Sequence, residues 1–160
     1  MNNIVLCGFM GCGKTTVGKR LSQLTGAQFV DLDLYIEDKY DMTISEIFEK
    51  YGENTFREYE HLACKQFKAQ QNTIISTGGG ALTFERNAKV FENDFVVFLD
   101  CPFNVIKKRL ENDSSRPLMN DNAENLYNQR RRVYQRVSNF TVDANNDIDE
   151  ICKLIINKRG

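Results

Sequence analysis

The sequence lacks the features that mark several large classes of protein. It has 160 residues and a formal net charge of −1, which argues against a nucleic-acid-binding domain because such domains are usually strongly basic. It has no long apolar run and no basic N-terminal segment, so we expect neither a signal peptide nor a membrane span, and we expect a cytoplasmic protein. No linker rich in Pro, Gly or Ser divides it, and its length suits a single domain over residues 1–160.

Disulfide and metal-site patterns are also missing. The five cysteines form an odd set in which no two are close in sequence, a pattern typical of reduced cytosolic thiols. His61 is the only histidine and has no Cys or carboxylate at ligand spacing, so we interpret it as a partly exposed helical residue. The sequence therefore predicts neither a disulfide framework nor a zinc site.

Short apolar runs alternate with longer amphipathic stretches. The runs are typical of buried strands and lie at Ile4–Cys7, Phe29–Val30, Thr73–Ser76, Phe95–Leu99 and Phe140–Val142. Helical patterns lie at Thr16–Leu24, Ile44–Tyr51, Phe56–Gln70, Phe103–Leu110, Ala123–Val137 and Ile148–Asn157. This order predicts an α/β fold, a three-layer sandwich around a central five-stranded parallel sheet, with the binding site beyond the carboxyl ends of the strands.

Residues 8–15, GFMGCGKT, form a P-loop between the first expected strand and the first helix. Its glycines allow backbone N–H groups to point at phosphate oxygens, and the following helix adds the positive end of its dipole. Lys14 is expected to reach the β and γ phosphates, and the Thr15 hydroxyl to ligate Mg²⁺. We therefore predict a nucleoside-triphosphate-dependent kinase of the P-loop type. The residues expected to contact ATP in this segment are Gly11, Cys12, Gly13, Lys14, Thr15 and Thr16.

The thiol of Cys12 lies inside this loop. A thiol near a helix N-terminus can have a lowered pKa and react, so we expect alkylation of Cys12 to inactivate the protein and ATP to protect it. The alternative is a passive side chain that fills space in the loop.

Two carboxylates follow the second expected strand, in the segment Asp31-Leu32-Asp33. The strand period of two would place both on one face, with Asp31 near Mg²⁺ through water and Asp33 orienting or deprotonating an acceptor hydroxyl. An N-cap carboxylate for the next helix is the alternative.

Two further segments suit an anionic, hydroxylated acceptor. Arg57 and Glu60 share a helix face, where Arg57 is either a bidentate clamp for a carboxylate or part of a solvated ion pair. The glycines at residues 78–80 follow the third strand and either expose backbone N–H groups to a ligand or form a flexible turn.

The polar stretch at residues 111–122 is predicted to be a lid. It contains Arg116, which we expect to close over the transferring phosphoryl group, although an ordinary loop arginine is the alternative. The helix after it carries Arg130, Arg131 and Arg132 in succession. Because neighbours on a helix are about 100° apart, at most one or two of these arginines can face one pocket.

Taken in order, GFMGCGKTT, DLD, FREYE, TGGG, RPL and RRRVY resemble the shikimate kinase family over nearly the whole chain. The resemblance implies that ATP, with one Mg²⁺ ion, phosphorylates the shikimate 3-hydroxyl in aromatic amino acid biosynthesis, and it suggests a monomer. It also implies that Asp33 contacts the shikimate hydroxyls, that Arg57 and Arg130 hold its carboxylate, that Gly79 donates a backbone N–H to it, and that Arg116 reaches the ATP phosphates. The expected catalytic residues are Lys14, Asp33 and Arg116, and the acceptor-binding helical region spans about residues 33–62.

The sequence departs from the family pattern at two places. The family commonly has Arg-x-Pro-Leu-Tyr where this chain has Arg-Arg-Arg-Val-Tyr; Tyr134 selects Arg130 as the equivalent arginine, but without the proline Arg131 stays an alternative. Cys12 replaces the usual serine of the P-loop. Two other functions stay open: a gluconate-type or nucleoside-monophosphate kinase on the same fold, and a non-catalytic ATP-binding regulatory module.

Overall fold

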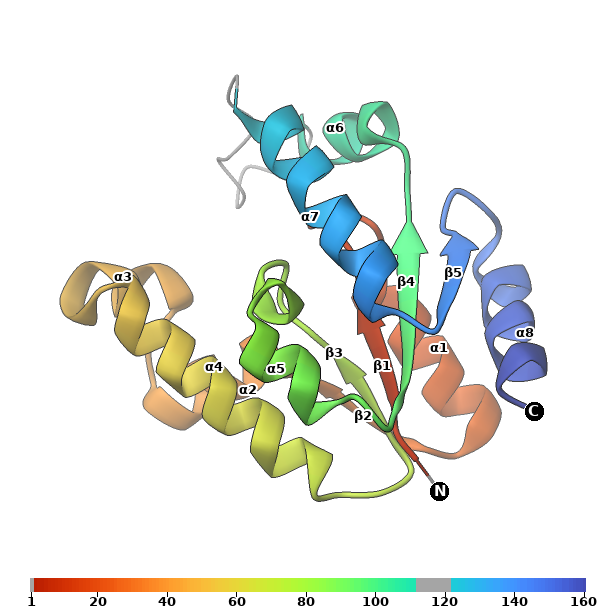
Figure 1. Ribbon diagram of the computed structural model, residues 1–160, viewed down its shortest axis with the longest axis horizontal. Helices are drawn as coiled ribbons and strands as arrows, with labels where there is room; N and C mark the ends of the chain where they lie inside the picture. The colour runs from red at the N-terminus through yellow and green to blue at the C-terminus, as the bar shows by residue number, and fades with distance from the viewer. Residues whose placement is uncertain (1, 112–121) are drawn as a thin grey trace.

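One fully parallel sheet organises the chain (Figure 1). The computed structural model describes residues 2–111 and 122–160. The strand order is β2–β3–β1–β4–β5, so the strand that leads into the P-loop lies at the centre of the sheet. The strands are β1 (Ile4–Cys7), β2 (Gln28–Asp31), β3 (Thr73–Ser76), β4 (Phe95–Asp100) and β5 (Phe140–Asp143). The predicted fold class, a five-stranded parallel sheet with helices around it, is confirmed.

Helices connect the strands and cover the sheet. They are α1 (Lys14–Thr25), α2 (Leu32–Tyr40), α3 (Ile44–Tyr51), α4 (Glu53–Lys68), α5 (Glu85–Val90), α6 (Phe103–Glu111), α7 (Ala123–Val137) and α8 (Ile148–Arg159), with a short 3₁₀ helix η1 (Ala81–Thr83) before α5. All six predicted helices are present, but the sequence patterns missed α2 and α5. Helix α2 buries only Leu32 and Ile36, and α5 has six residues, so neither has an amphipathic period long enough to recognise.

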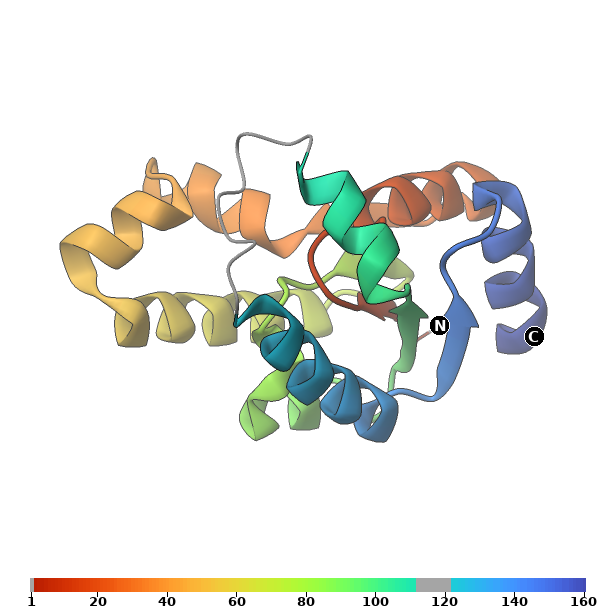
Figure 2. The same cartoon turned by 90° about the horizontal axis from the view of Figure 1, so that it is seen from above.

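Two hydrophobic cores lie on opposite faces of the sheet. Because side chains alternate along a strand, Ile4 and Leu6 of β1 face one core and Val5 and Cys7 face the other. The first core packs against α1 and α8, and the second against α2, α3, α4 and α5. Figure 2 shows α1 on one side of the strands and α5 on the other, with the strands as the middle layer.

The carboxyl ends of β1, β2 and β3 bring the functional segments together. The P-loop follows β1, Asp31 ends β2, and the glycine turn at residues 78–80 follows β3. The prediction that Asp31 and Asp33 lie on one strand is wrong. Asp31 is the N-cap of α2, and its carboxylate accepts hydrogen bonds from the amides of Asp33 and Leu34, so Asp33 lies in the first turn of a helix.

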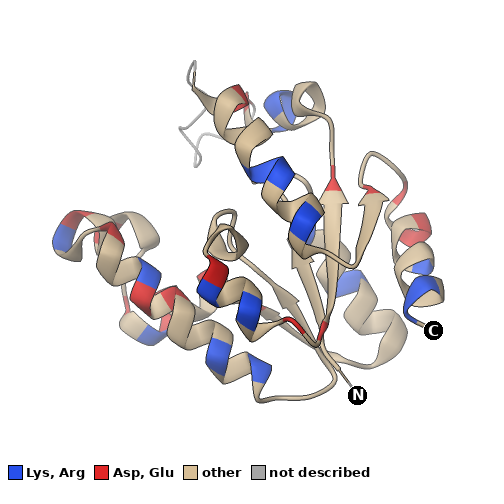
Figure 3. Cartoon of the chain, in the orientation of Figure 1, with Lys and Arg blue, Asp and Glu red and all other residues tan. Residues whose placement is uncertain are grey.

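Charged positions of both signs are mixed along the helices, and acidic residues stand at the tips of β4 and β5 (Figure 3). No helix within the described residues is both long and apolar enough to cross a membrane.

Candidate active site

The P-loop wraps the amino end of α1. Gly13 is the N-cap residue with φ of 97°, a left-handed conformation that glycine adopts without strain. The ammonium group of Lys14 folds back over the loop and donates to the carbonyls of Gly8 at 2.6 Å and Phe9 at 3.2 Å. The loop is therefore a backbone cradle with one cation beside it, an arrangement that suits a phosphate chain.

A hydroxyl and a carboxylate meet beside this cradle. The Thr15 hydroxyl donates to the Asp31 carboxylate, with 3.1 Å between the oxygens. Oxygen donors of this kind fit Mg²⁺, which is usually held by one or two protein groups together with phosphates and water. Within residues 2–111 and 122–160, no cluster of three or more His, Cys, Asp or Glu side chains could hold a metal, so the oxygen pair is the relevant feature for an ion bound with a nucleotide.

Cys12 is buried within the loop, with 2% of its surface exposed. Its sulfur lies 3.9 Å from the Lys14 ammonium and would be 2.6 Å from a Cβ atom placed on Gly8. The expectation of a readily alkylated thiol conflicts with this burial, because the sulfur points into the packed loop. The geometry favours the passive, space-filling alternative.

The glycine turn is contacted by charged side chains from three helices. A Cβ atom on Gly78 would lie 2.6 Å from a carboxylate oxygen of Asp33, and one on Gly79 would lie 3.2 Å from the guanidinium of Arg130. On Gly80 it would lie 3.0 Å from the guanidinium of Arg57 and 3.1 Å from that of Arg130. The absence of side chains at residues 78–80 lets these charged groups approach the backbone closely, so the turn is a packed part of the site and not a loose connection.

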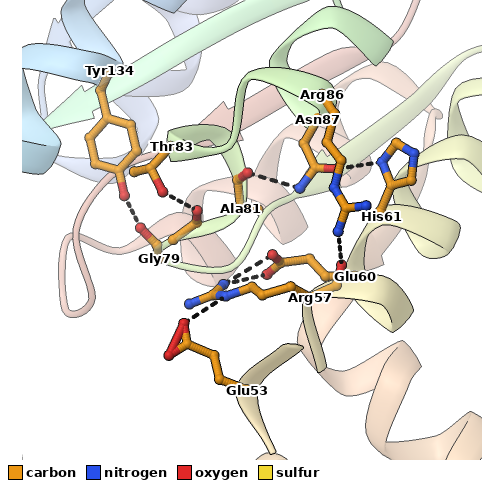
Figure 4. A network of polar contacts seen from close by, with 11 residues as sticks. Glu53, Arg57, Glu60, His61, Gly79, Ala81, Thr83, Arg86, Asn87 and Tyr134 are labelled. Carbon is orange, nitrogen blue, oxygen red and sulfur yellow. Dashed lines mark hydrogen bonds and ion pairs between the residues drawn. The ribbon is translucent and has the colours of Figure 1, made fainter. Parts of the chain in front are cut away.

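Arg57 is held in place by acidic neighbours. Its Nη1 donates to both carboxylate oxygens of Glu60, at 3.0 and 3.3 Å, and its Nε lies 3.6 Å from Glu53 (Figure 4). Burial raises the pKa of Glu60, against the opposing effect of Arg57. Among the described residues, the buried Nε of Arg57 has no hydrogen-bond acceptor. The interpretation of Arg57 and Glu60 as a solvated surface pair is wrong, since Glu60 is 1% exposed.

Asp33 has an environment suited to proton exchange. Burial, and next the nearby Asp31 carboxylate, raise the pKa of Asp33 to about 6, although Lys14 and Arg57 act in the opposite direction. A carboxyl group with this pKa is mostly ionised at neutral pH and is a stronger base than an ordinary aspartate.

Helix α7 places the side chains of its three consecutive arginines in different surroundings. Arg130 faces the glycine turn, Arg131 forms a two-point ion pair with Asp100 at 3.0 and 2.8 Å, and Arg132 is exposed. The alternative of Arg131 as the acceptor-facing arginine is therefore disfavoured by its pairing with Asp100 of β4.

Arg116 and most of the predicted lid lie outside the described residues. A cavity of about 420 Å³ lies between Phe9 and Met10 of the P-loop and the first turns of α7.

Several polar residues that support this site were missed by the sequence reasoning. Asn87 on α5 donates to the Ala81 carbonyl, Arg86 donates to the Arg57 carbonyl, and the Tyr134 hydroxyl donates to the Gly79 carbonyl. His61 is half-buried on α4 and contacts Asn87. On the P-loop side, Arg109 donates to the Gly11 carbonyl at 2.9 Å. Apart from the bond from Asn87 to Ala81, which spans six residues, these contacts join residues 26 or more positions apart, so sequence patterns do not reveal them.

Comparison with known proteins gives a consistent result. A family model described as Shikimate kinase matches residues 10–159. The shikimate kinase of Sulfurihydrogenibium sp. (strain YO3AOP1) is 41% identical over 148 residues, which cover 90% of this chain and 89% of that protein. The shikimate kinase of Staphylococcus epidermidis (strain ATCC 12228) is 42% identical over an alignment of 164 positions, covering 97% and 94%. The structure of shikimate kinase from Acinetobacter baumannii in complex with shikimate superposes with a TM-score of 0.90 at 34% identity, covering 99% of this chain and 95% of that one.

Proposed function

The chain belongs to the shikimate kinase family, and we propose that it transfers the γ-phosphoryl group of ATP to the 3-hydroxyl of shikimate beyond the carboxyl ends of β1 and β3. The observation that carries the assignment of the acceptor site is the convergence of Arg57 and Arg130 on Gly80. Their guanidinium nitrogens lie 3.0 and 3.1 Å from the position that a Cβ atom on Gly80 would occupy. An acceptor carboxylate between them could accept charge-assisted hydrogen bonds from both guanidinium groups.

The P-loop side binds and activates the phosphate chain. Backbone N–H groups between Gly11 and Thr16, including that of Cys12, surround the phosphates, and Lys14 swings from the loop carbonyls onto the β and γ phosphates. Thr15 would ligate Mg²⁺ directly, and Asp31 through water. The bound ion would neutralise charge on the phosphate oxygens. Arg116 would add positive charge at the transferring group.

The acceptor side orients the attacking hydroxyl. Arg57 and Arg130 hold the carboxylate of shikimate, the Gly79 amide donates to the acceptor, and Asp33 contacts its hydroxyls. Asp33 also receives the proton of the attacking hydroxyl, because its pKa of about 6 leaves it ionised but basic near neutral pH. Lys14 and Arg116 then face the developing negative charge, so most of the catalysis comes from positioning and electrostatics.

A coupled ADP-release assay against shikimate, gluconate, AMP and CMP tests this proposal. We expect Mg²⁺-dependent release of ADP from ATP only when shikimate is the acceptor, with shikimate 3-phosphate as the product. Release only with gluconate or a nucleotide would instead indicate the other kinase activities. ATP binding with no release for any acceptor would indicate a regulatory module.

A cytoplasmic monomer stays a prediction. Sedimentation velocity across a range of protein concentrations measures the oligomeric state, and a dimer would contradict this prediction.

A further inference from the structure

Asn87 links two parts of the acceptor site through one buried side chain. It lies on α5 with 1% of its surface exposed. Its Oδ1 is 2.7 Å from Nδ1 of His61 on α4, and its Nδ2 donates to the Ala81 carbonyl at 3.0 Å (Figure 4). Helix α4 carries Arg57, and Ala81 directly follows the glycine turn. The Asn87 side chain therefore connects the helix of the carboxylate clamp to the turn that approaches the acceptor.

The chemistry of the groups fixes the direction of both hydrogen bonds. The Ala81 carbonyl can only accept, so the NH₂ group of Asn87 faces it and the amide oxygen faces His61. An amide oxygen also only accepts, so Nδ1 of His61 carries the proton.

The glycine turn is held by its carbonyl groups. The Gly78 carbonyl accepts from the Ala81 amide, the Gly79 carbonyl from the Tyr134 hydroxyl, and the Gly80 carbonyl from the Thr83 amide and hydroxyl. The fourth carbonyl in the row, that of Ala81, accepts from the Phe84 amide at 3.3 Å and from the Asn87 side chain at 3.0 Å, and Asn87 is the donor that ties it to α5. Within the described part of the chain, the amides of residues 78–80 donate to no protein group. Fixing the carbonyls leaves these amides available to a ligand.

The residue before Asn87 strengthens the same connection. Arg86 donates to the Arg57 carbonyl at 3.2 Å and pairs with Glu58 at 2.7 Å. Helix α5 is thus hydrogen-bonded to α4 through Arg86 and to the end of the glycine turn through Asn87. A shift of α5 would change the spacing between Arg57 and the turn.

We propose that Asn87, supported by His61, is a positioning residue that keeps the glycine turn in register with Arg57 for acceptor binding. This inference rests on the proposed function. Asn87 does not touch the acceptor; it acts through the Ala81 carbonyl and through His61. Its loss should weaken the acceptor site and leave the P-loop unchanged, because the side-chain hydrogen bonds of Asn87 and His61 run to each other and to Ala81.

The first test is steady-state kinetics of Asn87→Asp and Asn87→Ala. The aspartate turns a carboxylate toward the Ala81 carbonyl, and the alanine removes both hydrogen bonds. We expect the KM for shikimate to rise about tenfold in each variant, the effect of losing one buried hydrogen-bonding arrangement, while the KM for ATP changes less than about twofold. Isothermal titration calorimetry with shikimate should show Kd rising by a similar factor.

Asn3→Asp is the matched control. Asn3 is also 1% exposed, and its Nδ2 also donates to carbonyls, those of Phe67 at 3.3 Å and Gln70 at 2.9 Å, but it precedes β1 at the opposite end of the sheet. We expect this variant to lower Tm and leave the KM for shikimate unchanged. The inference is overturned if the Asn87 variants behave like Asn3→Asp, or if both KM values rise equally.

His61→Ala provides a milder test if the Asn87 variants fold poorly. It leaves the bond to Ala81 and removes only the outer support, so the KM for shikimate should rise by about two- to fivefold. Because His61 is the only histidine, its ¹⁵N signals can be read without assignment, and the wild type should show the Nδ1–H tautomer. An Nε2–H tautomer or an unchanged KM contradicts the inference. An inactive wild type instead contradicts the proposed function.

Discussion

The two halves of the site are built in different ways. The phosphate-binding half is one continuous segment, residues 8–15, which joins β1 to α1 and presents backbone groups. The proposed acceptor-binding half draws Asp33 from α2, Arg57 from α4, the glycine turn from the end of β3, and Arg130 from α7. A local segment forms its binding geometry from its own backbone, whereas the acceptor half depends on how four separate elements pack.

The two halves also differ in their electrostatics. The P-loop offers backbone amides and Lys14, whose ammonium group donates to carbonyls of the same loop. The acceptor half buries Glu60 against Arg57 and half-buries Asp33, and desolvation raises the pKa values of both carboxyl groups. Burial of such charges opposes folding unless a partner compensates, so this half gives up stability for a site prepared for its ligand.

The largest predicted effect comes from Asp33→Asn, which removes the proposed proton acceptor from the acceptor half alone. We expect kcat to fall about 10²- to 10⁴-fold, the usual range for loss of a general base, with little change in ATP affinity. In the wild type, kcat/KM should fall as the pH is lowered through about 6, because protonated Asp33 cannot take the hydroxyl proton. A pH–rate profile measures this limb, and Asp33→Asn should lack it.

The same substitution should stabilise the fold. The folded-state pKa of about 6 lies above the ordinary value of 3.8, so folding is favoured by protonation and this contribution is lost as the pH rises through about 6. Above that pH, the neutral amide should raise the free energy of unfolding by about 1–3 kcal/mol. Urea unfolding at pH 5 and pH 8 checks the sign. A variant less stable than wild type at pH 8 would argue against a costly buried carboxylate.

The next largest effect is expected for Arg57→Ala, which should change the KM of the acceptor half and not that of the phosphate-binding half. Loss of a charge-assisted contact worth about 1.5–3 kcal/mol should raise the KM for shikimate about 10- to 150-fold and leave that for ATP nearly unchanged. Arg132→Ala is the control, because it removes the same charge from an exposed position on α7. Equal increases in both KM values would contradict the carboxylate clamp.

The difference between the halves also explains what sequence reasoning achieved. The P-loop and the five strands were predicted because their signals are local. The placement of Asp33 on a strand was wrong because α2 is short and begins directly at Asp31, whose capping role was only the alternative interpretation. The choice between Arg130 and Arg131 depends on Asp100, a partner 31 residues away. The contacts of Asn87 with His61 and Ala81 depend on α5, which has too few residues to give a helical pattern.

The smallest predicted effect is in the phosphate-binding half, where Cys12→Ser tests how far a backbone-built site tolerates a changed side chain. Cys12 is 2% exposed and contacts Gly8 and Lys14 rather than the surface. A serine fills slightly less space and offers Lys14 a better acceptor, so we expect kcat and the KM for ATP to change less than about twofold. Modification by iodoacetamide should be slow in the folded protein, because its five cysteines are buried. The rate of modification should be equal in the variant and the wild type, because it would occur at thiols other than that of Cys12. Rapid inactivation that ATP prevents and Cys12→Ser abolishes would show instead that the loop opens enough to expose the sulfur, and the phosphate-binding half would then be less rigid than its backbone geometry indicates.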